Sequence, residues 1–537
     1  MKLNFGTYSY PSRRTAVFAK NGITATGTPQ AAESGMEIMR KGGNAVDAVV
    51  AMAMCLPVVE PVANGIGGDA FALVYTNGKL YGLNASGPAP SKINARLLRD
   101  KGYDSVPDFG FEPVTVPGAP SAWAALNSRF GKLPLTETAK PAVKYAAEGY
   151  PLSRLTATAF NNAFKTYSKT NSDDKFKGWY DTFAKDGKTP GTGEIFRCAD
   201  MARTIEEIAE TGAESFYRGD LMEKIVKFSD HHGGYFTKDD FLNYKPEWVE
   251  PASVNYRGYD VCELPPNGHG IAALIALNIL ENFGLGAARE TSRNYHLQIE
   301  AMKLAFADAF RYIADPKYMT VSVKDLLSKE YAKERSRLIT EKAGLYSCGK
   351  PKDSSTVYLC AADGGGNMVS YIQSNYMGFG SGLCVPGTGI SLHNRGANFS
   401  LEPGHDNLLE PGKRPYHTII PGFLMKDGKP IGPFGVMGGF MQPQGHVQMM
   451  VNTIDFSMNP QDSLDAPRWQ WMKEKEVSAD SFVNSDILND LSERGHDVNV
   501  AAQYGSIGGR GQIIWRLENG VLCAGTEPRT DGTVCVY

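Results

Sequence analysis

Strand-like segments stand at both ends of this sequence, and a long helix-rich region separates them. Strand and helix signals alternate over residues 16–90, and helical periodicity dominates residues 120–234. From Thr356 the apolar runs 357–362 and 368–372, joined by a glycine-rich turn, predict a β-hairpin. Strands on both sides of a helical middle predict an α+β layered architecture, in which two segments of the chain share sheets.

Length and charge narrow the class of protein. The 537 residues suggest three or four domains at about 150 residues each, and 42% hydrophobic with 21% charged residues is ordinary for a globular protein. The net charge of −3 gives no basic field to gather nucleic acid or an anionic membrane. We therefore expect neither nucleic acid nor a membrane as a partner.

The sequence also predicts a compartment. The N-terminal residues contain no continuous apolar core of a secretory signal, and no apolar stretch reaches the roughly 20 residues of a membrane-spanning helix. The eight cysteines are dispersed without a CxxC pair. We expect a cytoplasmic protein with free thiols.

Several common catalytic motifs are absent. The sequence contains no HExxH, no Walker loop and no GxSxG, which disfavours a zinc protease, a P-loop enzyme and an α/β-hydrolase. The Gly65–Asp69 segment lacks the GxGxxG spacing and follows a helix, so a tight turn with close backbone packing is favoured over a phosphate cradle. We expect no metal and no organic cofactor.

Four features after residue 355 have possible chemical roles. Thr356 opens the first hairpin strand, Ser370 and Ser374 lie on the returning strand, and the 378–382 loop is glycine-rich. Gly438 and Gly439 follow an apolar strand and could present two N–H groups to an oxyanion. Each feature also has an ordinary explanation, since threonine is common in strands and Gly-Gly is common in turns. The residues alone predict a soluble α/β protein with anion-sized glycine loops.

Six short motifs follow one another along the chain. They are Gly42–Ala48 with Gly65–Gly68, Thr356–Asp363 with Asn367, Phe379–Gly382 with Gly387–Ile390, Pro411–Pro415, Gly435–Gly439 and Pro528–Gly532. In this order they resemble the γ-glutamyltransferase family over nearly the whole chain.

The resemblance implies a fold and a maturation step. The family has the N-terminal-nucleophile hydrolase fold, an αββα sandwich with two β-sheets between helix layers. Its precursor cuts itself before a threonine, here between Ser355 and Thr356. The products would be a large segment, 1–355, and a small segment, 356–537, which remain two fragments of one intertwined fold.

The resemblance also implies catalytic roles. Thr356 would be the nucleophile, and its α-amine, with a pKa of about 8, can act as the base only after the cut has freed it. Ser374 aligns with a hydroxyl that assists the nucleophile. Gly438 and Gly439 would supply oxyanion donors.

The substrate-binding positions depart from the glutamate-specific members of the family. Their acidic residue for the substrate α-amine is Asn398 here, which has no charge to pair with an ammonium. Two serines that flank the γ-glutamyl carboxylate are replaced by His417 and Thr418. These changes fit a member closer to the cephalosporin or glutaryl acylases.

The arginine that clamps the substrate α-carboxylate has no clean match. The ungapped position is Ala95, so Arg96 beside it, or Lys92 nearby, is the predicted substitute.

Three functions remain open from the sequence. The leading hypothesis is a self-processing enzyme that hydrolyses or transfers the γ-glutamyl group of glutathione or related amides. The alternative within the enzyme class is a glutaryl or cephalosporin-type acylase whose acyl group lacks the α-amine. The alternative from another class is a catalytically inactive binding relative. A small dicarboxylic or γ-glutamyl amide is the expected partner, and further oligomerisation is open.

Overall fold

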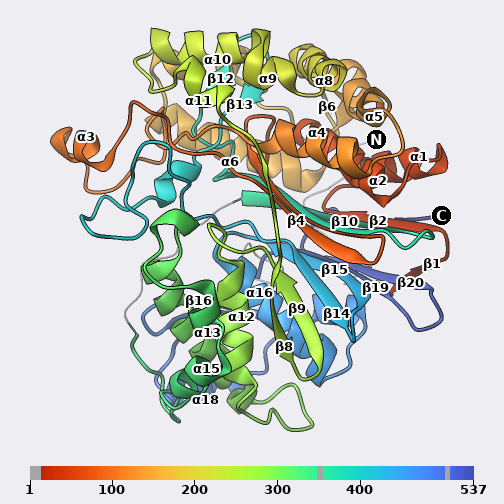
Figure 1. Ribbon diagram of the computed structural model, residues 1–537, viewed down its shortest axis with the longest axis vertical. Coiled ribbons are helices and arrows are strands. Elements are labelled where there is room, and N and C mark those ends of the chain that lie inside the picture. Colours follow the sequence, from red (N-terminus) through yellow and green to blue (C-terminus); the bar gives the residue numbers. More distant parts are fainter. Residues whose placement is uncertain (1–13, 347–354, 502–507) are drawn as a thin grey trace.

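The structure, a computed structural model, describes residues 14–346, 355–501 and 508–537. Two seven-stranded sheets face each other at its centre, and helices cover the outer face of each (Figure 1). This arrangement confirms the αββα sandwich expected from the sequence.

The first sheet, called here the β10 sheet, is antiparallel throughout. Its strands, in spatial order, are β21 (Thr533–Val536), β2 (Gly22–Thr26), β10 (Ser355–Asp363), β11 (Met368–Tyr376), β3 (Asp69–Thr76), β4 (Lys79–Ala85) and β7 (Glu247–Val249). The predicted hairpin is β10–β11, which lies at the centre of this sheet.

The second sheet, called here the β15 sheet, is also antiparallel. Its strands, in spatial order, are β1 (Val17–Ala19), β20 (Leu522–Thr526), β19 (Arg510–Arg516), β15 (Lys429–Met437), β14 (Gly422–Lys426), β9 (Tyr259–Glu263) and β8 (Ala252–Tyr256). Both sheets therefore interleave strands from before and after residue 355.

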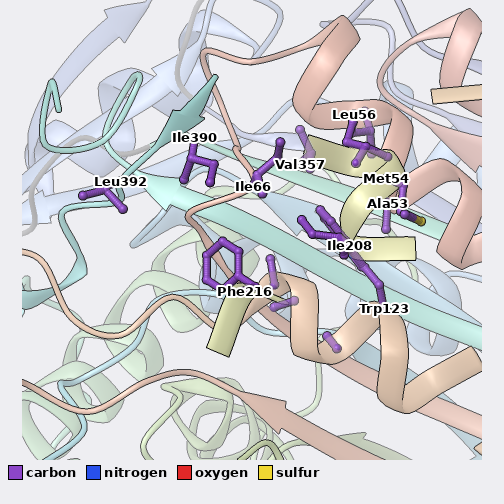
Figure 2. Packing of buried hydrophobic residues seen from close by; sticks show 14 of the residues in the cluster. Ala53, Met54, Leu56, Ile66, Trp123, Ile208, Phe216, Val357, Ile390 and Leu392 are labelled. Carbon is purple, nitrogen blue, oxygen red and sulfur yellow. The ribbon is translucent and has the colours of Figure 1, made fainter. Parts of the chain in front are cut away.

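Strand alternation divides the core into layers. Val357 and Leu359 of β10 pack in the cluster beneath the helices of the β10 sheet, whereas Tyr358 and Cys360 pack in the cluster between the two sheets. Figure 2 shows Val357 in the helix-side cluster with Leu56. Because side chains alternate along a strand, Thr356 belongs on the inter-sheet side with Tyr358.

Two groups of helices cover the sandwich. The helices over the β10 sheet include α1 (Pro29–Arg40), α2 (Ala45–Val59), α4 (Ala119–Phe130), α5 (Leu135–Glu148) and α8 (Ala199–Thr211). Those over the β15 sheet include α12 (Gly270–Leu280), α13 (Ser292–Tyr312) and α16 (Met441–Met450).

The α2 helix begins at a capping box formed by Asn44 and Asp47. Asn44 accepts hydrogen bonds from the N–H groups of Val46 and Asp47, and Asp47 accepts one from the Asn44 N–H, which is a capping box. The Ala45 N–H donates to Asp363 in the β10–β11 turn at 2.8 Å. The first two sequence motifs thus meet, and they join α2 to the central hairpin.

The two sheets approach closely at Gly435. A Cβ atom there would lie 2.4 Å from the Tyr358 ring, so only glycine fits without movement. This contact fixes β15 against β10 close to the start of both motifs.

Two further expectations concern thiols and membranes. All seven cysteines in the described ranges are unpaired, and Cys348 lies outside them. Within the same ranges, no helix combines the length and apolarity that crossing a bilayer requires.

Candidate active site

A β-bulge brings the predicted nucleophile and its predicted helper together. Ser355 pairs with Tyr376 and Val357 pairs with Gln373, so the single residue Thr356 stands opposite two residues of β11. A bulge of this kind redirects side chains locally. The Thr356 hydroxyl donates to Ser374 Oγ at 3.1 Å, and both side chains are fully buried.

Tyr376, at the end of the bulge, has a positive φ of 75°. This conformation costs a tyrosine on the order of 1–3 kcal/mol and persists where surrounding contacts impose it. Here its N–H donates to Ser374 Oγ at 2.8 Å, and its ring lies 4.5 Å from the guanidinium carbon of Arg395. The first contact orients the Ser374 hydroxyl, and the second holds Arg395, which also donates to Ser374.

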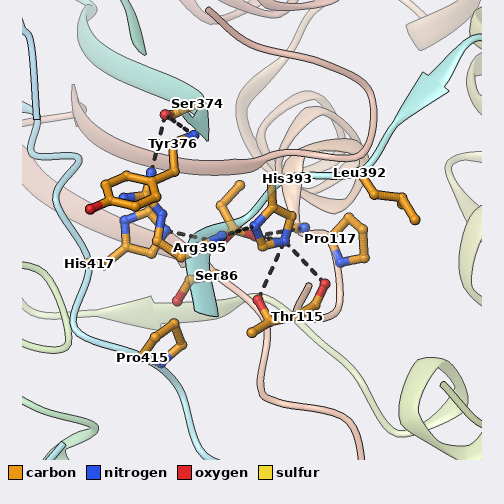
Figure 3. A network of polar contacts seen from close by, with 12 residues as sticks. Ser86, Thr115, Pro117, Ser374, Tyr376, Leu392, His393, Arg395, Pro415 and His417 are labelled. Atoms are coloured by element: carbon orange, nitrogen blue, oxygen red, sulfur yellow. Dashed lines mark hydrogen bonds and ion pairs between the residues drawn. The ribbon is translucent and has the colours of Figure 1, made fainter. Parts of the chain in front are cut away.

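Arg395 completes the cluster (Figure 3). It begins the 3₁₀ turn η4 (Arg395–Asn398) and is fully buried. One guanidinium nitrogen donates to Ser374 Oγ at 3.1 Å and another to Thr418 Oγ1 at 2.5 Å. Arg395 is not among the residues predicted from the sequence, because arginine is usually exposed and nothing local signals a buried one.

Arg395 has no contacting carboxylate in the described part of the chain, where no carboxylate oxygen comes within 4.0 Å of its nitrogens. Burial lowers its pKa to about 10, and the charge of nearby Asp69 opposes this effect. Arg395 is therefore a cation at neutral pH.

Asp69 is the nearest buried acid. It accepts hydrogen bonds from the Gly118 N–H at 3.1 Å and from His417 Nε2 at 3.0 Å. Burial raises the pKa of Asp69 to about 7, and the Arg395 charge acts in the opposite direction.

Two neutral histidines line this cluster. Burial places the His417 pKa well below its ordinary value and lowers that of His393 to about 3. The His393 ring bonds the Thr115 carbonyl through Nε2 at 3.1 Å and accepts from the Arg395 N–H at 3.1 Å. Neither ring is a cation, so His417 orients Asp69 and His393 orients the backbone of Arg395.

The segment holding His417 and Thr418 is fixed by the large segment of the chain. Asn267 donates from Nδ2 to the Pro415 carbonyl at 2.8 Å, and the His417 N–H donates to the Asn267 carbonyl at 2.9 Å. The His269 N–H donates to the His417 carbonyl at 2.9 Å. Thr418 is thereby aligned to accept from Arg395.

Asn398 ends the same 3₁₀ turn. Its carbonyl accepts from Asn407 Nδ2 at 2.7 Å. Its own Nδ2 is buried and has no hydrogen-bond partner among the residues described. Asn398 thus offers an amide donor without a partner in the described residues, at the position where the family resemblance implies an acid in glutamate-specific members.

Gly438 and Gly439 follow β15 with positive φ values of 126° and 56°. In the described ranges, neither N–H donates to a backbone carbonyl among the hydrogen bonds of turns, loops and helix caps. Gly438 lines a cavity of about 160 Å³ together with Gly27 and Thr28. These two residues continue β2 beyond Thr26, which pairs with Leu359, so the cavity lies toward the Thr356 end of β10.

A buried ion network supports the loop beside Gly438. Glu527 accepts from Arg468 at 2.7 Å and from Arg529 at 2.6 Å, and Arg529 also bonds Asp480. Arg468 also bonds the Gly508 carbonyl, next to Gly509. A Cβ at Gly438 would lie 3.2 Å from Gly509 Cα, so the network holds this loop against the predicted oxyanion donors.

Arg96 does not reach this cluster. It lies on the short helix α3 (Ala95–Asp100), its side chain is 85% exposed, and it pairs with Asp100 at 3.6 Å. Lys92 is likewise exposed and pairs with Asp230. The physical reason is that α3 buries Ala95 and Leu98, which turns Arg96 to solvent. The cation of this cluster is Arg395, and Arg96 as the carboxylate clamp stays a prediction that these contacts do not support.

The two glycine loops pack rather than cradle a ligand. A Cβ at Gly67 would lie 2.4 Å from the Ser391 carbonyl oxygen, which confirms the tight turn predicted for this segment. In the 378–382 loop, Phe379 is buried among aromatic rings including Trp179 and Phe183.

Comparison with known proteins identifies the family. The profile of the family described as "Gamma-glutamyltranspeptidase" matches residues 31–537. The chain belongs to this family. It is 36% identical over 516 residues to the glutathione hydrolase-like YwrD proenzyme of Bacillus subtilis, covering 94% of this chain and 96% of that protein. It is 32% identical over 523 residues to the oxamate amidohydrolase proenzyme of Klebsiella pneumoniae, covering 94% and 97%.

A solved structure is also similar. The cephalosporin acylase from Bacillus halodurans superposes with a TM-score of 0.97 at 54% identity, covering 100% of this chain and 99% of that chain. Membership in a family with proenzyme relatives makes this chain an enzyme of the N-terminal-nucleophile type.

Proposed function

We propose that this γ-glutamyltranspeptidase family member is a self-processing amidohydrolase. It acts on substrates whose acyl group carries no α-ammonium. The observation that supports it is the buried hydrogen-bond chain from Thr356 through Ser374 to Arg395, beside an uncharged Asn398. A buried cation next to the nucleophile repels an ammonium, and the uncharged Asn398 supplies no anion to pair with one.

Maturation begins with Thr356. Its Oγ1 attacks the carbonyl carbon of Ser355, and the Ser355–Thr356 C–N bond breaks as an ester forms. Water then hydrolyses the ester, which leaves a carboxylate on Ser355 and a free α-amine on Thr356. The cut separates residues 1–355 from residues 356–537.

Catalysis then uses the freed amine. The α-amine takes the Oγ1 proton as Oγ1 attacks the substrate amide carbonyl, and Ser374 orients Oγ1. The N–H groups of Gly438 and Gly439 stabilise the oxyanion. The substrate C–N bond breaks, the leaving amine takes the proton, and water releases the acid from the Thr356 ester.

A second candidate is γ-glutamyl hydrolysis or transfer, which the glutathione hydrolase-like relative favours. The two are separated by comparing glutaryl-4-nitroanilide with γ-glutamyl-4-nitroanilide, which differ only in the α-ammonium. We expect the glutaryl amide to have the higher kcat/KM. A large preference for the γ-glutamyl amide would select the second candidate.

A further inference from the structure

We propose that Arg395 and Asn398 together bind a carboxylate on the acyl half of the substrate, close to the attacked carbonyl. The substrate class is then the half-amides of short dicarboxylic acids. This inference rests on the proposed amidohydrolase function and assigns the residues that select its acyl group.

The first observation is a buried cation without a contacting anion. Arg395 is fully buried, and its hydrogen-bond partners Ser374 and Thr418 are neutral hydroxyls. Its Nε is buried and has no partner among the residues described. Because burying an uncompensated charge is costly, an anion supplied by the substrate would bind strongly here.

The second observation is that the side-chain amide nitrogen of Asn398 has no hydrogen-bond partner among the residues described. Arg395 and Asn398 are the first and last residues of the turn η4. Side chains three residues apart eclipse each other in a 3₁₀ turn, so both project from the same side. Arg395 Nε and Asn398 Nδ2 are both buried donors without partners in the described chain. Two donors on one side match the acceptor-only chemistry of a carboxylate.

The third observation limits the length of the acyl group. Arg395 and Thr356 both bond Ser374 Oγ, each at 3.1 Å, so the guanidinium nitrogen lies at most twice that distance from Oγ1. The attacked carbon must approach Oγ1 to about 3–3.5 Å. A carboxylate on Arg395 can satisfy both contacts only if few bonds join it to the attacked carbon.

The neighbouring groups favour the same occupant. His417 and His393 are neutral, and Asp69 already accepts from His417 and the Gly118 N–H. The cluster therefore has a cation that no adjacent residue pairs with directly.

The test measures the processed enzyme with a series of substrates whose acyl chains increase in length. The probes are the 4-nitroanilide half-amides of oxalic, malonic, succinic and glutaric acids, each with its neutral methyl ester as a matched control. We expect kcat/KM to be highest for the short anionic probes and to exceed that of the matched ester by about 100-fold, as for a charge-assisted bidentate contact. Lengthening the acid should lower this ratio.

Arg395→Met should bring the anion-to-ester ratio close to one, whereas Arg395→Lys should keep part of it. Asn398→Asp adds a negative charge without touching the bonds from Arg395 to Ser374, and should lower the ratio at least about 10-fold. Formation of the two fragments shows that a variant is folded. If Arg395→Met does not fold, the anion-to-ester ratio of Asn398→Asp tests the inference instead.

Two outcomes would overturn the inference. An equal loss for anions and esters in Arg395→Met would make Arg395 only a positioning residue for Ser374. If the wild-type enzyme has nearly equal kcat/KM for an anionic probe and its methyl ester, the proposed carboxylate site is refuted, whereas the amidohydrolase function is not. If wild-type protein hydrolyses none of these probes, the proposed function fails with it.

Discussion

Ser374 is the residue at which the hydrogen bonds of the site converge. Its Oγ accepts from the Thr356 hydroxyl, the Tyr376 N–H and an Arg395 nitrogen. Donors that converge on a hydroxyl oxygen make that hydroxyl a stronger donor in turn. When Oγ1 of Thr356 loses its proton, Ser374 is thus placed to stabilise the negative charge that develops there.

We expect Ser374→Ala to slow both self-cleavage and amide hydrolysis by about 10²-fold, the scale of losing one positioned donor. Cleavage is followed by gel electrophoresis and turnover by nitroaniline release. Ser370→Ala is the matched control, because Ser370 lies on the same strand but bonds Tyr358. Cleavage of Ser374→Ala at the wild-type rate would remove Ser374 from the mechanism.

The raised pKa of Asp69 predicts how the stability of the protein depends on pH. Its pKa of about 7 in the folded protein lies above the ordinary value of 3.8, so the native state retains a proton that the unfolded chain releases. The contribution of Asp69 to stability is therefore greatest at low pH and is lost as pH rises toward 7. In Asp69→Asn, stability should fall less between pH 4.5 and 8 than in the wild type.

Denaturant unfolding of both proteins at those two pH values measures this difference. The variant suits the site, since an asparagine oxygen can still accept from His417. Identical pH dependence in the two proteins would mean that Asp69 keeps its ordinary pKa.

At the scale of elements, the central hairpin and its opposing strand place the chemistry. The β10–β11 bulge sets Thr356 opposite Ser374, and β15 ends at Met437, directly before Gly438. The close approach at Gly435 holds these strands together across the sandwich. The geometry of the site therefore depends on how tightly the two sheets pack.

Gly435→Ala tests this packing. Its Cβ would lie 2.4 Å from the Tyr358 ring, so we expect a loss of about 1–3 kcal/mol in the free energy of unfolding and slower self-cleavage. Gly284→Ala is the control, since a Cβ there meets nothing within 4 Å. Equal stability of the two variants, measured by denaturant unfolding, would show that the sheets tolerate separation.

Local patterns predicted the elements better than the binding groups. The β10–β11 hairpin and the glycine turn at Gly67 follow from short-range sequence, and both are confirmed. Arg395 could not be predicted, because its burial depends on segments far apart in the chain. Arg96 was chosen by its nearness to a motif, and the α3 helix turns it outward.

For the whole molecule, both sheets are built from both parts of the chain. In the β10 sheet, β10 pairs with β2 and β11 pairs with β3. In the β15 sheet, β14 pairs with β9. The length of the chain suggested three or four domains, whereas the structure has one layered sandwich in which neither part has a complete sheet.

The two fragments should therefore stay together after the cut. We expect them to co-elute as one species in size-exclusion chromatography under native conditions and to separate only in denaturant. Separation of the fragments in native buffer would contradict an intertwined fold.

The central claim is that Thr356 is the nucleophile that the chain frees by cutting itself. Intact-mass measurement of purified protein, with N-terminal sequencing of the smaller species, tests it most directly. We predict two species that correspond to residues 1–355 and 356–537, the second beginning Thr-Val-Tyr-Leu, and one uncut chain for Thr356→Ala. A wild-type protein that stays uncut after long incubation, or a Thr356→Ala variant that is still cut at this bond, would contradict the claim.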